Sequence, residues 1–109
     1  MKRLLVIAML ALTPMTAHAE FYTGNEIYPG IQDWVDGDGV SAKHAFLTGY
    51  VLGVADTSMD VMWCPTYSVT VGQTTLIVHK WLQSHPESLH FTGDSLVVSA
   101  LREAFPCKK

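Results

Sequence analysis

Cys64 and Cys107 are the side chains with the most distinctive chemistry in this 109-residue sequence. A thiolate that lies near a histidine and a carboxylate can act as a nucleophile. The residue types for such a set are present in His79, His85, His90 and Asp94. No feature around Cys64 indicates an activated thiol, and no Gly-x-Ser-x-Gly motif is present. A bond between the two cysteines would also remove the nucleophile. We therefore expect a protein that is not an enzyme.

Histidines and aspartates in two regions have the residue types of metal ligands. His85 and His90 lack the three- or four-residue spacing that places two imidazoles on one face of a helix. The aspartates between residues 33 and 38 offer hard oxygen ligands. An EF-hand needs a glutamate at its twelfth position, where counting from Asp33 gives His44. We expect no metal and no other cofactor.

The first 19 residues have the pattern of a secretory signal peptide. Residues 1–3 are positively charged, residues 4–12 are apolar, and residues 17–19 form a small-residue cleavage site. The apolar run is much shorter than the roughly 20 residues that cross a bilayer as a helix. We expect cleavage after Ala19 and release of a soluble protein, residues 20–109, into the periplasm.

The part that remains after cleavage is long enough for one domain. Removal of Lys2 and Arg3 leaves five basic against ten acidic residues, a formal charge of −5. Apart from Lys108-Lys109 the basic residues are scattered, which argues against binding to nucleic acid or to an anionic membrane surface. A basic or neutral protein is the partner that this charge favours.

Export to an oxidising compartment, with no third cysteine present, favours a disulfide between Cys64 and Cys107. Two free thiols, a bridge between chains and a reactive cysteine are the alternatives. Closing a loop of about 44 residues would stabilise the fold by about 4 kcal/mol in the chain-entropy model. That is a large share of the net stability of a small domain.

Capping residues and apolar periodicity predict an all-α fold, a small bundle of about four helices. A capping box at residues 23–26 starts a short first helix near residues 24–34, which Pro29-Gly30 interrupts. Ser41 caps a second helix, which should have ended after residues 63–65.

Two further helices are predicted in the C-terminal half. A second capping box at residues 70–73 starts a helix that continues to about residue 85. The β-branched run at residues 69–78 leaves a strand as the alternative for this segment. The last helix begins at residue 94 or 95 and ends at Phe105, because Pro106 follows.

Gly49 and Gly53 lie one turn apart on the second predicted helix, which would allow another backbone to approach closely. Each glycine costs about 1 kcal/mol relative to alanine, so we predict that close packing offsets this cost; a coincidental pair is the alternative. Asp56 is predicted to accept hydrogen bonds from neighbours on the same face. The residues assigned to this face are Ala42, Ala45, Phe46, Gly49, Leu52, Gly53 and Asp56.

Two turns are candidates for partner binding, because turns project from rigid scaffolds. One is the acidic turn at residues 36–39, and the other is the segment at residues 85–93. Both segments also fit a plain connecting role. The candidate side chains are Asp36, Asp38, His85, Glu87 and His90.

Five short segments occur in order along residues 20–109. They are Thr23 to Ile27; Gly49 to Asp56; Cys64-Pro65 with Val69 to Gln73; Trp81-Leu82 with His85 to His90; and Ala100-Leu101 with Ala104 to Cys107. Each is weak alone, but the ordered set is specific. It resembles the Rap/Tai family of immunity proteins of type VI secretion.

The resemblance implies an all-α periplasmic domain, often a homodimer, that binds and occludes a peptidoglycan amidase effector. In relatives that bind such amidases, an exposed loop enters the cleft of a papain-like cysteine enzyme. The binding protein then needs a rigid scaffold more than chemistry of its own. Members commonly carry a further cysteine after the first helix, which residues 28–32 lack here. The first helix is therefore expected to be less tethered than in relatives.

A small periplasmic acid-stress chaperone or stress-related binding protein is the alternative hypothesis. Chaperones of the Hde type are also small, helical and held by one disulfide. The acidic balance and the four histidines after residue 19 would recharge strongly in acid. This hypothesis predicts dimer dissociation and client binding at roughly pH 2 to 3, where carboxylates protonate.

Overall fold

The computed structural model describes residues 21–37 and 41–108. These residues confirm the predicted all-α class, because they form four α-helices and one 3-10 helix but no strand. The elements are α1 (Gly24–Asp36), α2 (Ala42–Ser58), α3 (Val71–Ser84), η1 (Pro86–Ser88) and α4 (Gly93–Ala104). The predicted signal peptide lies outside the described residues. None of the described helices is long and apolar enough to cross a membrane.

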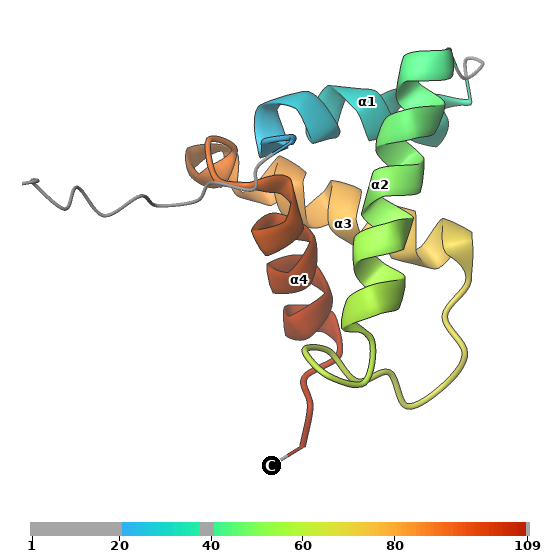
Figure 1. Cartoon of the computed structure of the whole chain (residues 1–109), viewed down its shortest axis with the longest axis vertical. Coiled ribbons are helices and arrows are strands. Elements are labelled where there is room, and N and C mark those ends of the chain that lie inside the picture. Colours follow the sequence, from blue (N-terminus) through green and yellow to red (C-terminus); the bar gives the residue numbers. More distant parts are fainter. Residues whose placement is uncertain (1–20, 38–40, 109) are drawn as a thin grey trace, which may run out of the picture.

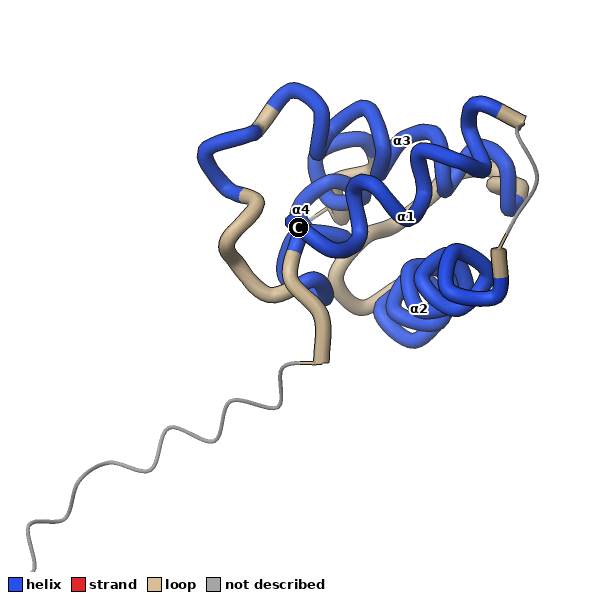
Figure 2. Tube along the Cα trace, turned by 90° about the horizontal axis from the view of Figure 1, so that it is seen from above, coloured by secondary structure: helices blue, strands red, loops and turns tan. Residues whose placement is uncertain are grey.

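The four α-helices surround one core, and every pair of them is in contact. In Figure 1, α1 lies across one end, while α2 and α4 run away from it toward the end that carries the C-terminus. Seen from above, α1 lies between α2 and α3 (Figure 2). The loop between α2 and α3 and the segment after α4 therefore share the end far from α1.

The helix starts follow the capping residues of the sequence. At α1, Glu26 accepts a hydrogen bond from the Thr23 amide at 2.8 Å, and at α3 the Thr70 and Gln73 pair forms a full capping box. Ser41 caps α2 as predicted. The strand alternative for residues 69–78 is therefore wrong, and α4 begins a residue before its predicted start.

The predicted interruption of the first helix is wrong. Helix α1 continues through Pro29 and ends at Asp36, followed by Gly37 with a left-handed φ of 73°. A proline inside a helix costs about 3 kcal/mol. Ile27 and Ile31 are both fully buried, and burial of such side chains contributes about 1.5 to 3 kcal/mol each. Core packing of the two isoleucines thus offsets the missing hydrogen bond at Pro29.

The largest fully buried side chain is Trp63, which follows α2 and lies outside the helices. It belongs to one continuous apolar cluster to which all four α-helices contribute. The other members of the cluster are Ile27, Ile31, Leu47, Val51, Ala55, Val78, Leu82, Leu96, Val97, Ala100 and Leu101. The core therefore extends from α1 to the start of the loop after α2.

The face of α2 that was predicted to pack is the exposed one. A methyl group added at Gly49 or Gly53 would meet nothing within 4 Å, so no other part of the described chain packs closely there. Asp56 is also exposed. The buried face consists of Leu47, Thr48, Val51, Ala55 and Ser58. Both faces recur at three- and four-residue steps, so periodicity alone could not distinguish them.

The N-terminus of α1 is held by the segment between α3 and α4. The amides of Gly24 and Asn25 donate to the carbonyls of Phe91 and Leu89 at 3.2 and 2.8 Å. The first amides of a helix have no partner within the helix, so these carbonyls satisfy them. In return the Gly93 amide donates to the Tyr22 carbonyl at 2.7 Å. These backbone bonds tether the start of α1 without a covalent link.

Gly93→Ala is expected to destabilise the protein by about 1 to 3 kcal/mol, because the new methyl group would lie 3.0 Å from the Tyr22 carbonyl oxygen and push against Ile27. The matched control is Gly72→Ala, whose methyl group would make an ordinary contact with Trp34 at 3.5 Å. Urea unfolding should show lower stability for the first variant and equal or higher stability for the second. Equal stability of the two variants would contradict the close approach at α4.

Candidate functional site

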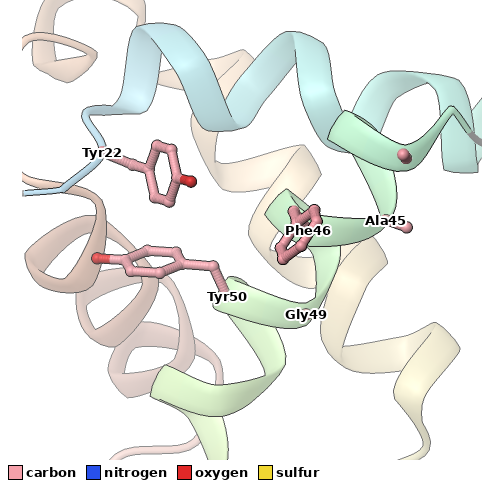
Figure 3. Close-up of a pocket in the computed structure, with 6 residues that line it drawn as sticks. Tyr22, Ala45, Phe46, Gly49 and Tyr50 are labelled. Carbon is pink, nitrogen blue, oxygen red and sulfur yellow. The ribbon is translucent and has the colours of Figure 1, made fainter.

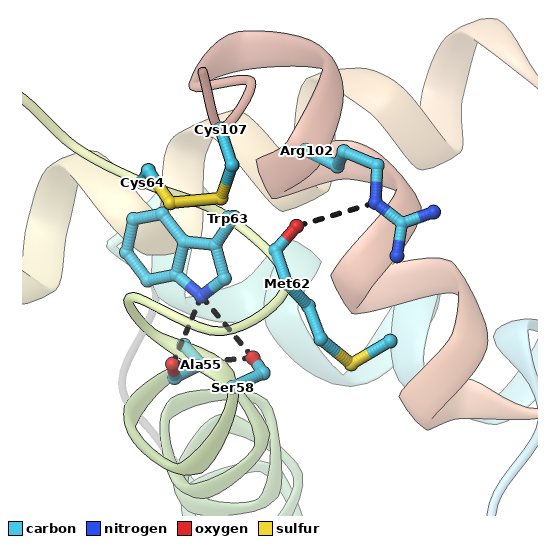
Figure 4. Close-up of a disulfide and its surroundings, with 7 residues drawn as sticks. All are labelled: Ala55, Ser58, Met62, Trp63, Cys64, Arg102 and Cys107. Carbon is cyan, nitrogen blue, oxygen red and sulfur yellow. Dashed lines mark hydrogen bonds between the residues drawn. A yellow bond between two sulfur atoms is a disulfide. The ribbon is translucent and has the colours of Figure 1, made fainter. Parts of the chain in front are cut away.

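The disulfide between Cys64 and Cys107 is present, as predicted. It links the start of the α2–α3 loop to the segment that follows α4 (Figure 4). Neither cysteine is free. The alternatives of free thiols, a bridge between chains and a nucleophilic cysteine are therefore wrong for this structure. A backbone hydrogen bond runs alongside, from the Cys64 amide to the Phe105 carbonyl at 2.9 Å.

The Trp63 indole fixes the residue before the disulfide. Its Nε1–H donates to the Ala55 carbonyl at 3.0 Å and to the Ser58 hydroxyl oxygen at 3.1 Å. All three residues are buried, and Figure 4 shows the indole nitrogen facing the last turn of α2. Phe105 lies against the indole, with ring centroids 5.8 Å apart. The chain end at Cys107 and the end of α2 are thereby packed onto one another.

Between α2 and Trp63 the chain makes a tight turn at residues 59–62. Asp60 has a positive φ of 62°, which is uncommon for a residue other than glycine. The amides of Val61 and Met62 both donate to the Ser58 carbonyl, and the Asp60 amide donates to the Trp63 carbonyl at 2.8 Å. The turn backbone is therefore closed by its own hydrogen bonds.

Two apolar side chains project from this turn. Val61 is 77% exposed and Met62 is 43% exposed. Arg102 of α4 donates its Nε–H to the Met62 carbonyl at 3.2 Å (Figure 4). A shallow groove beside the turn is lined by Val61, Met62, Arg102, Pro106, Cys107 and Lys108. We call Val61 and Met62 the apolar tip.

A second surface feature is an open apolar groove on the exposed face of α2. Phe46, at its centre, is 75% exposed (Figure 3). Tyr22 and Tyr50 form one wall and meet edge to face, with ring centroids 5.2 Å apart. The remaining lining residues are Ala42, Ala45 and Gly49, so no charged side chain of residues 21–37 or 41–108 lines this groove.

The candidate loop residues differ in what they do. His85 stacks on Trp81 with ring centroids 3.9 Å apart and donates from Nδ1 to the Trp81 carbonyl, so it is part of the α3 terminus. Glu87 and His90 are exposed. Their role in binding stays a prediction, and the segment around them has the structural role of capping α1.

The acidic turn is only partly described. Asp36 is exposed at the end of α1 and accepts a hydrogen bond from Nε2 of Gln32 at 2.8 Å. Asp38 lies outside the described residues. The described interactions of Asp36 do not include His85, Glu87 or His90. Its part in partner binding likewise remains a prediction.

His79 is a buried histidine that joins α3 to α1. Its Nε2–H donates to Oε1 of Gln32, and its ring stacks on Tyr28. Burial lowers the pKa of His79 below 6.5, while the negative charge of Asp36 acts in the opposite direction. The fold thus stabilises the neutral imidazole. In this form His79 packs α3 against α1 through Gln32 and Tyr28.

The apolar tip was not among the residues predicted from the sequence. The sequence predicts the disulfide of Cys64 and a helix end near residues 63–65, but it does not indicate the stabilising role of Trp63. The available signal was Val61-Met62, two apolar residues between Asp60 and the Trp63-Cys64 pair. Apolar residues next to a disulfide-bonded cysteine can be buried in the core or exposed to solvent. The sequence alone does not tell which of these applies to Val61 and Met62.

The described side chains include two exposed apolar features, the tip and the groove on α2. Among the described residues, no group of three or more histidines, cysteines and carboxylates could hold a metal ion. Both cysteines are in the disulfide. A rigid helical scaffold that exposes an apolar tip and an apolar groove defines a small protein-binding module.

The sequence model of the Rap1a immunity proteins matches residues 23–107. The match extends from the N-cap of α1 to the second cysteine of the disulfide. The chain therefore belongs to the Rap1a immunity protein family, which confirms the resemblance noted from the five segments. No curated protein matches the chain. Membership of this family implies an inhibitor rather than an enzyme.

Stability is expected to fall as the pH is lowered from above 6.5 toward the depressed pKa of His79. The unfolded chain binds a proton at His79 more readily than the folded chain does, so acid favours unfolding. His79→Gln should flatten this part of the pH dependence. Urea unfolding of both proteins at pH 5, 6, 7 and 8 measures the free energy of unfolding at each pH. This range extends about 1.5 units either side of the ordinary histidine pKa. Identical pH profiles would show that His79 does not contribute.

Proposed function

We propose that this protein is a periplasmic immunity protein that binds and occludes a peptidoglycan amidase effector of type VI secretion. The observation that carries the proposal is the family match over residues 23–107, which covers every described helix. The amidase as target comes from the family resemblance of the sequence. The fold contributes exposed apolar surface, and among the described residues both cysteines are oxidised and no metal-binding cluster occurs.

Two features support a periplasmic location. The pattern of residues 1–19 is that of a cleaved signal peptide. The disulfide between Cys64 and Cys107 is of a kind that persists in oxidising compartments such as the periplasm. An inhibitor of a cell-wall enzyme must also be exported to meet that enzyme, so location and target are consistent with each other.

Occlusion requires shape and rigidity. A protein inhibitor whose surface is already in its bound conformation loses little conformational entropy on binding, and its backbone moves little. Here the disulfide, the Trp63 hydrogen bonds and the capping of α1 by residues 89 and 91 all restrict the scaffold. Binding of this kind blocks access to an active site without any chemical step.

We also propose a homodimer that is formed through the groove on α2. Apolar residues occur all round this helix, yet the described residues cover only one of its faces. Helices of this kind are normally buried on every side. Phe46 and Gly49 are neighbours on the exposed face. Two α2 helices related by a two-fold axis can place each phenyl ring over the glycine of the other copy, which is a self-complementary contact.

The acid-stress chaperone hypothesis has weaker support. It rests on composition and on features that many small exported proteins share. The family match concerns immunity proteins. We therefore retain the immunity function as the conclusion.

Periplasmic expression of the target amidase should lyse cells, and co-expression of the full chain should restore growth. A version without residues 1–19 is the control and should fail to protect, because it would remain on the other side of the inner membrane from the enzyme. Growth curves and gel filtration of the purified pair measure the effect. Lysis with the exported chain, together with no complex, would reject the proposal.

Phe46→Glu is expected to convert the dimer to a monomer, because it places a charge at the centre of the apolar contact. Val71→Glu is the matched control, since Val71 is also exposed but lies on α3, outside the groove. Sedimentation equilibrium gives the mass of each variant. A monomeric parent protein, or a dimeric Phe46→Glu variant, would contradict the proposed interface.

A further inference from the structure

Met62 is the most exposed sulfur-containing residue of the described chain. A thiol would react with an oxidant first, but neither cysteine is free. Of the two methionines in residues 20–109, Met59 is half-buried and packs against the core, while Met62 is 43% exposed. The oxidation of a methionine depends on the exposure of its thioether. The fold therefore presents one thioether to the solvent and largely covers the other.

The exposure of Met62 is fixed by the turn that carries it. The Met62 amide donates to the Ser58 carbonyl at 2.8 Å, and the Met62 carbonyl accepts the Nε–H of Arg102 at 3.2 Å. The next residue, Trp63, is fully buried and hydrogen-bonded to the end of α2. Both backbone groups of Met62 are thus bonded and its neighbour is anchored. The backbone is therefore held in the orientation that leaves the thioether in contact with solvent.

Arg102 can supply a hydrogen-bond donor to an oxygen atom placed on this sulfur. Arg102 and Met62 line the same groove, and in Figure 4 both side chains project to the same side of the turn. The Nε–H of Arg102 is bonded to the Met62 carbonyl, whereas no acceptor for its two terminal amino groups is found in residues 21–37 and 41–108. Hydrogen bonds from a charged guanidinium are stronger than those between neutral groups. Arg102 is therefore placed to stabilise an oxidised Met62 side chain.

The charged groups near Met62 lie on two different surfaces. Arg102 and Lys108 are exposed cations that line the groove shared with Met62. Asp60 is an exposed carboxylate of the same turn, but it lines a separate groove together with Met59 and residues 65–69. A sulfoxide oxygen carries a partial negative charge, so it is favoured on the side of the cations and disfavoured on the side of Asp60.

We propose that Met62 is a reversible oxidation site, at which hydrogen peroxide forms a sulfoxide whose oxygen accepts a hydrogen bond from Arg102. A lone pair of the sulfur attacks one peroxide oxygen, so that the S–O bond forms as the O–O bond breaks. The sulfur loses two electrons and the peroxide is reduced. The leaving hydroxide takes up the proton of the transferred oxygen and becomes water. A dithiol-dependent sulfoxide reductase reverses such a modification.

Oxidation of Met62 changes the apolar tip and leaves the core intact. A sulfoxide is polar, so one of the two apolar side chains of the tip becomes a hydrogen-bonding one. Met62 is not a member of the core cluster, so its oxidation places no polar atom among the buried side chains. The site follows from exposure and hydrogen bonds within the chain and is independent of the proposed immunity function. Export, as proposed above, would place it in an oxidising compartment.

Two matched variants test the selection of Met62. Met59→Leu keeps only the Met62 thioether in residues 20–109, Met62→Leu keeps only that of Met59, and leucine conserves the volume of methionine. Both folded, disulfide-bonded proteins are treated with the same concentration of hydrogen peroxide. Mass spectrometry of the proteolytic peptide that contains residues 59–62 measures the uptake of one oxygen atom over time. The Met59→Leu protein should react about fivefold faster or more. Equal rates, or a faster reaction of the Met62→Leu protein, would overturn the proposal.

The same reaction in guanidinium chloride separates the effect of the fold from the reactivity of each methionine. In the unfolded chains both thioethers contact solvent, so the two variants should react at equal rates. A rate ratio that persists after unfolding would show that the fold does not select Met62, which also overturns the proposal. Thermal unfolding before the peroxide is added confirms that both variants are folded.

Arg102→Leu, made in the Met59→Leu protein, tests the hydrogen bond to the sulfoxide. Oxidation should lower the melting temperature about 4 °C more in this variant than in the protein that keeps Arg102, because the new oxygen has lost its charged donor. An equal loss in both proteins would overturn the assigned hydrogen bond.

Reversibility is tested on the folded, oxidised Met59→Leu protein. A pre-reduced methionine sulfoxide reductase, added without free thiol so that the bond between Cys64 and Cys107 stays intact, should remove the oxygen from Met62. A sulfoxide that persists in the folded protein, but is reduced after unfolding, would show that the site is not reversible and would overturn that part of the proposal.

Discussion

The clamp at the end of α2 is the constraint on which the rest of the structure depends. The disulfide from Cys64 to Cys107 closes a loop with a sequence separation of 43 residues, which contributes about 4 kcal/mol in the chain-entropy model. The Trp63 indole adds two buried hydrogen bonds at the same point. Together they fix the relative positions of α2 and α4 and the conformation of the turn between them. A domain of this size has a small core, so a covalent link of this kind is a large part of its stability.

The opposite end of the molecule is held without a covalent bond. The amides at the start of α1 are bonded to carbonyls of residues 89 and 91, and the α4 amide at Gly93 is bonded to Tyr22. Additional ties to α1 come from the hydrogen bond between His79 and Gln32 and from the contact between His44 and Asp33. This arrangement holds the first helix in place without a disulfide of its own. Each end of the scaffold is therefore fixed by a different kind of interaction.

Much of the fold could be predicted from the sequence because the signals are local. The capping residues at 23, 41 and 70 mark helix starts through short-range hydrogen bonds, and two cysteines in an exported chain favour a single disulfide. The packing of α2 could not be predicted, because both of its faces have helical periodicity and only tertiary contacts select Leu47 and Val51 as the buried ones. The apolar tip was missed for the same reason. Exposure of Val61 depends on the burial of Trp63, which is decided by residues distant in the sequence.

The central claim is that the clamp holds the turn at residues 59–62 rigid in the protein before any partner binds. Native-state hydrogen exchange of the oxidised protein measures this directly, through the amides of Asp60, Met62 and Cys64, whose acceptors are the carbonyls of Trp63, Ser58 and Phe105. The account predicts that these amides exchange as slowly as those in the buried part of α2. Exchange at the rate of an unprotected peptide, while the α2 amides stay protected, would contradict it.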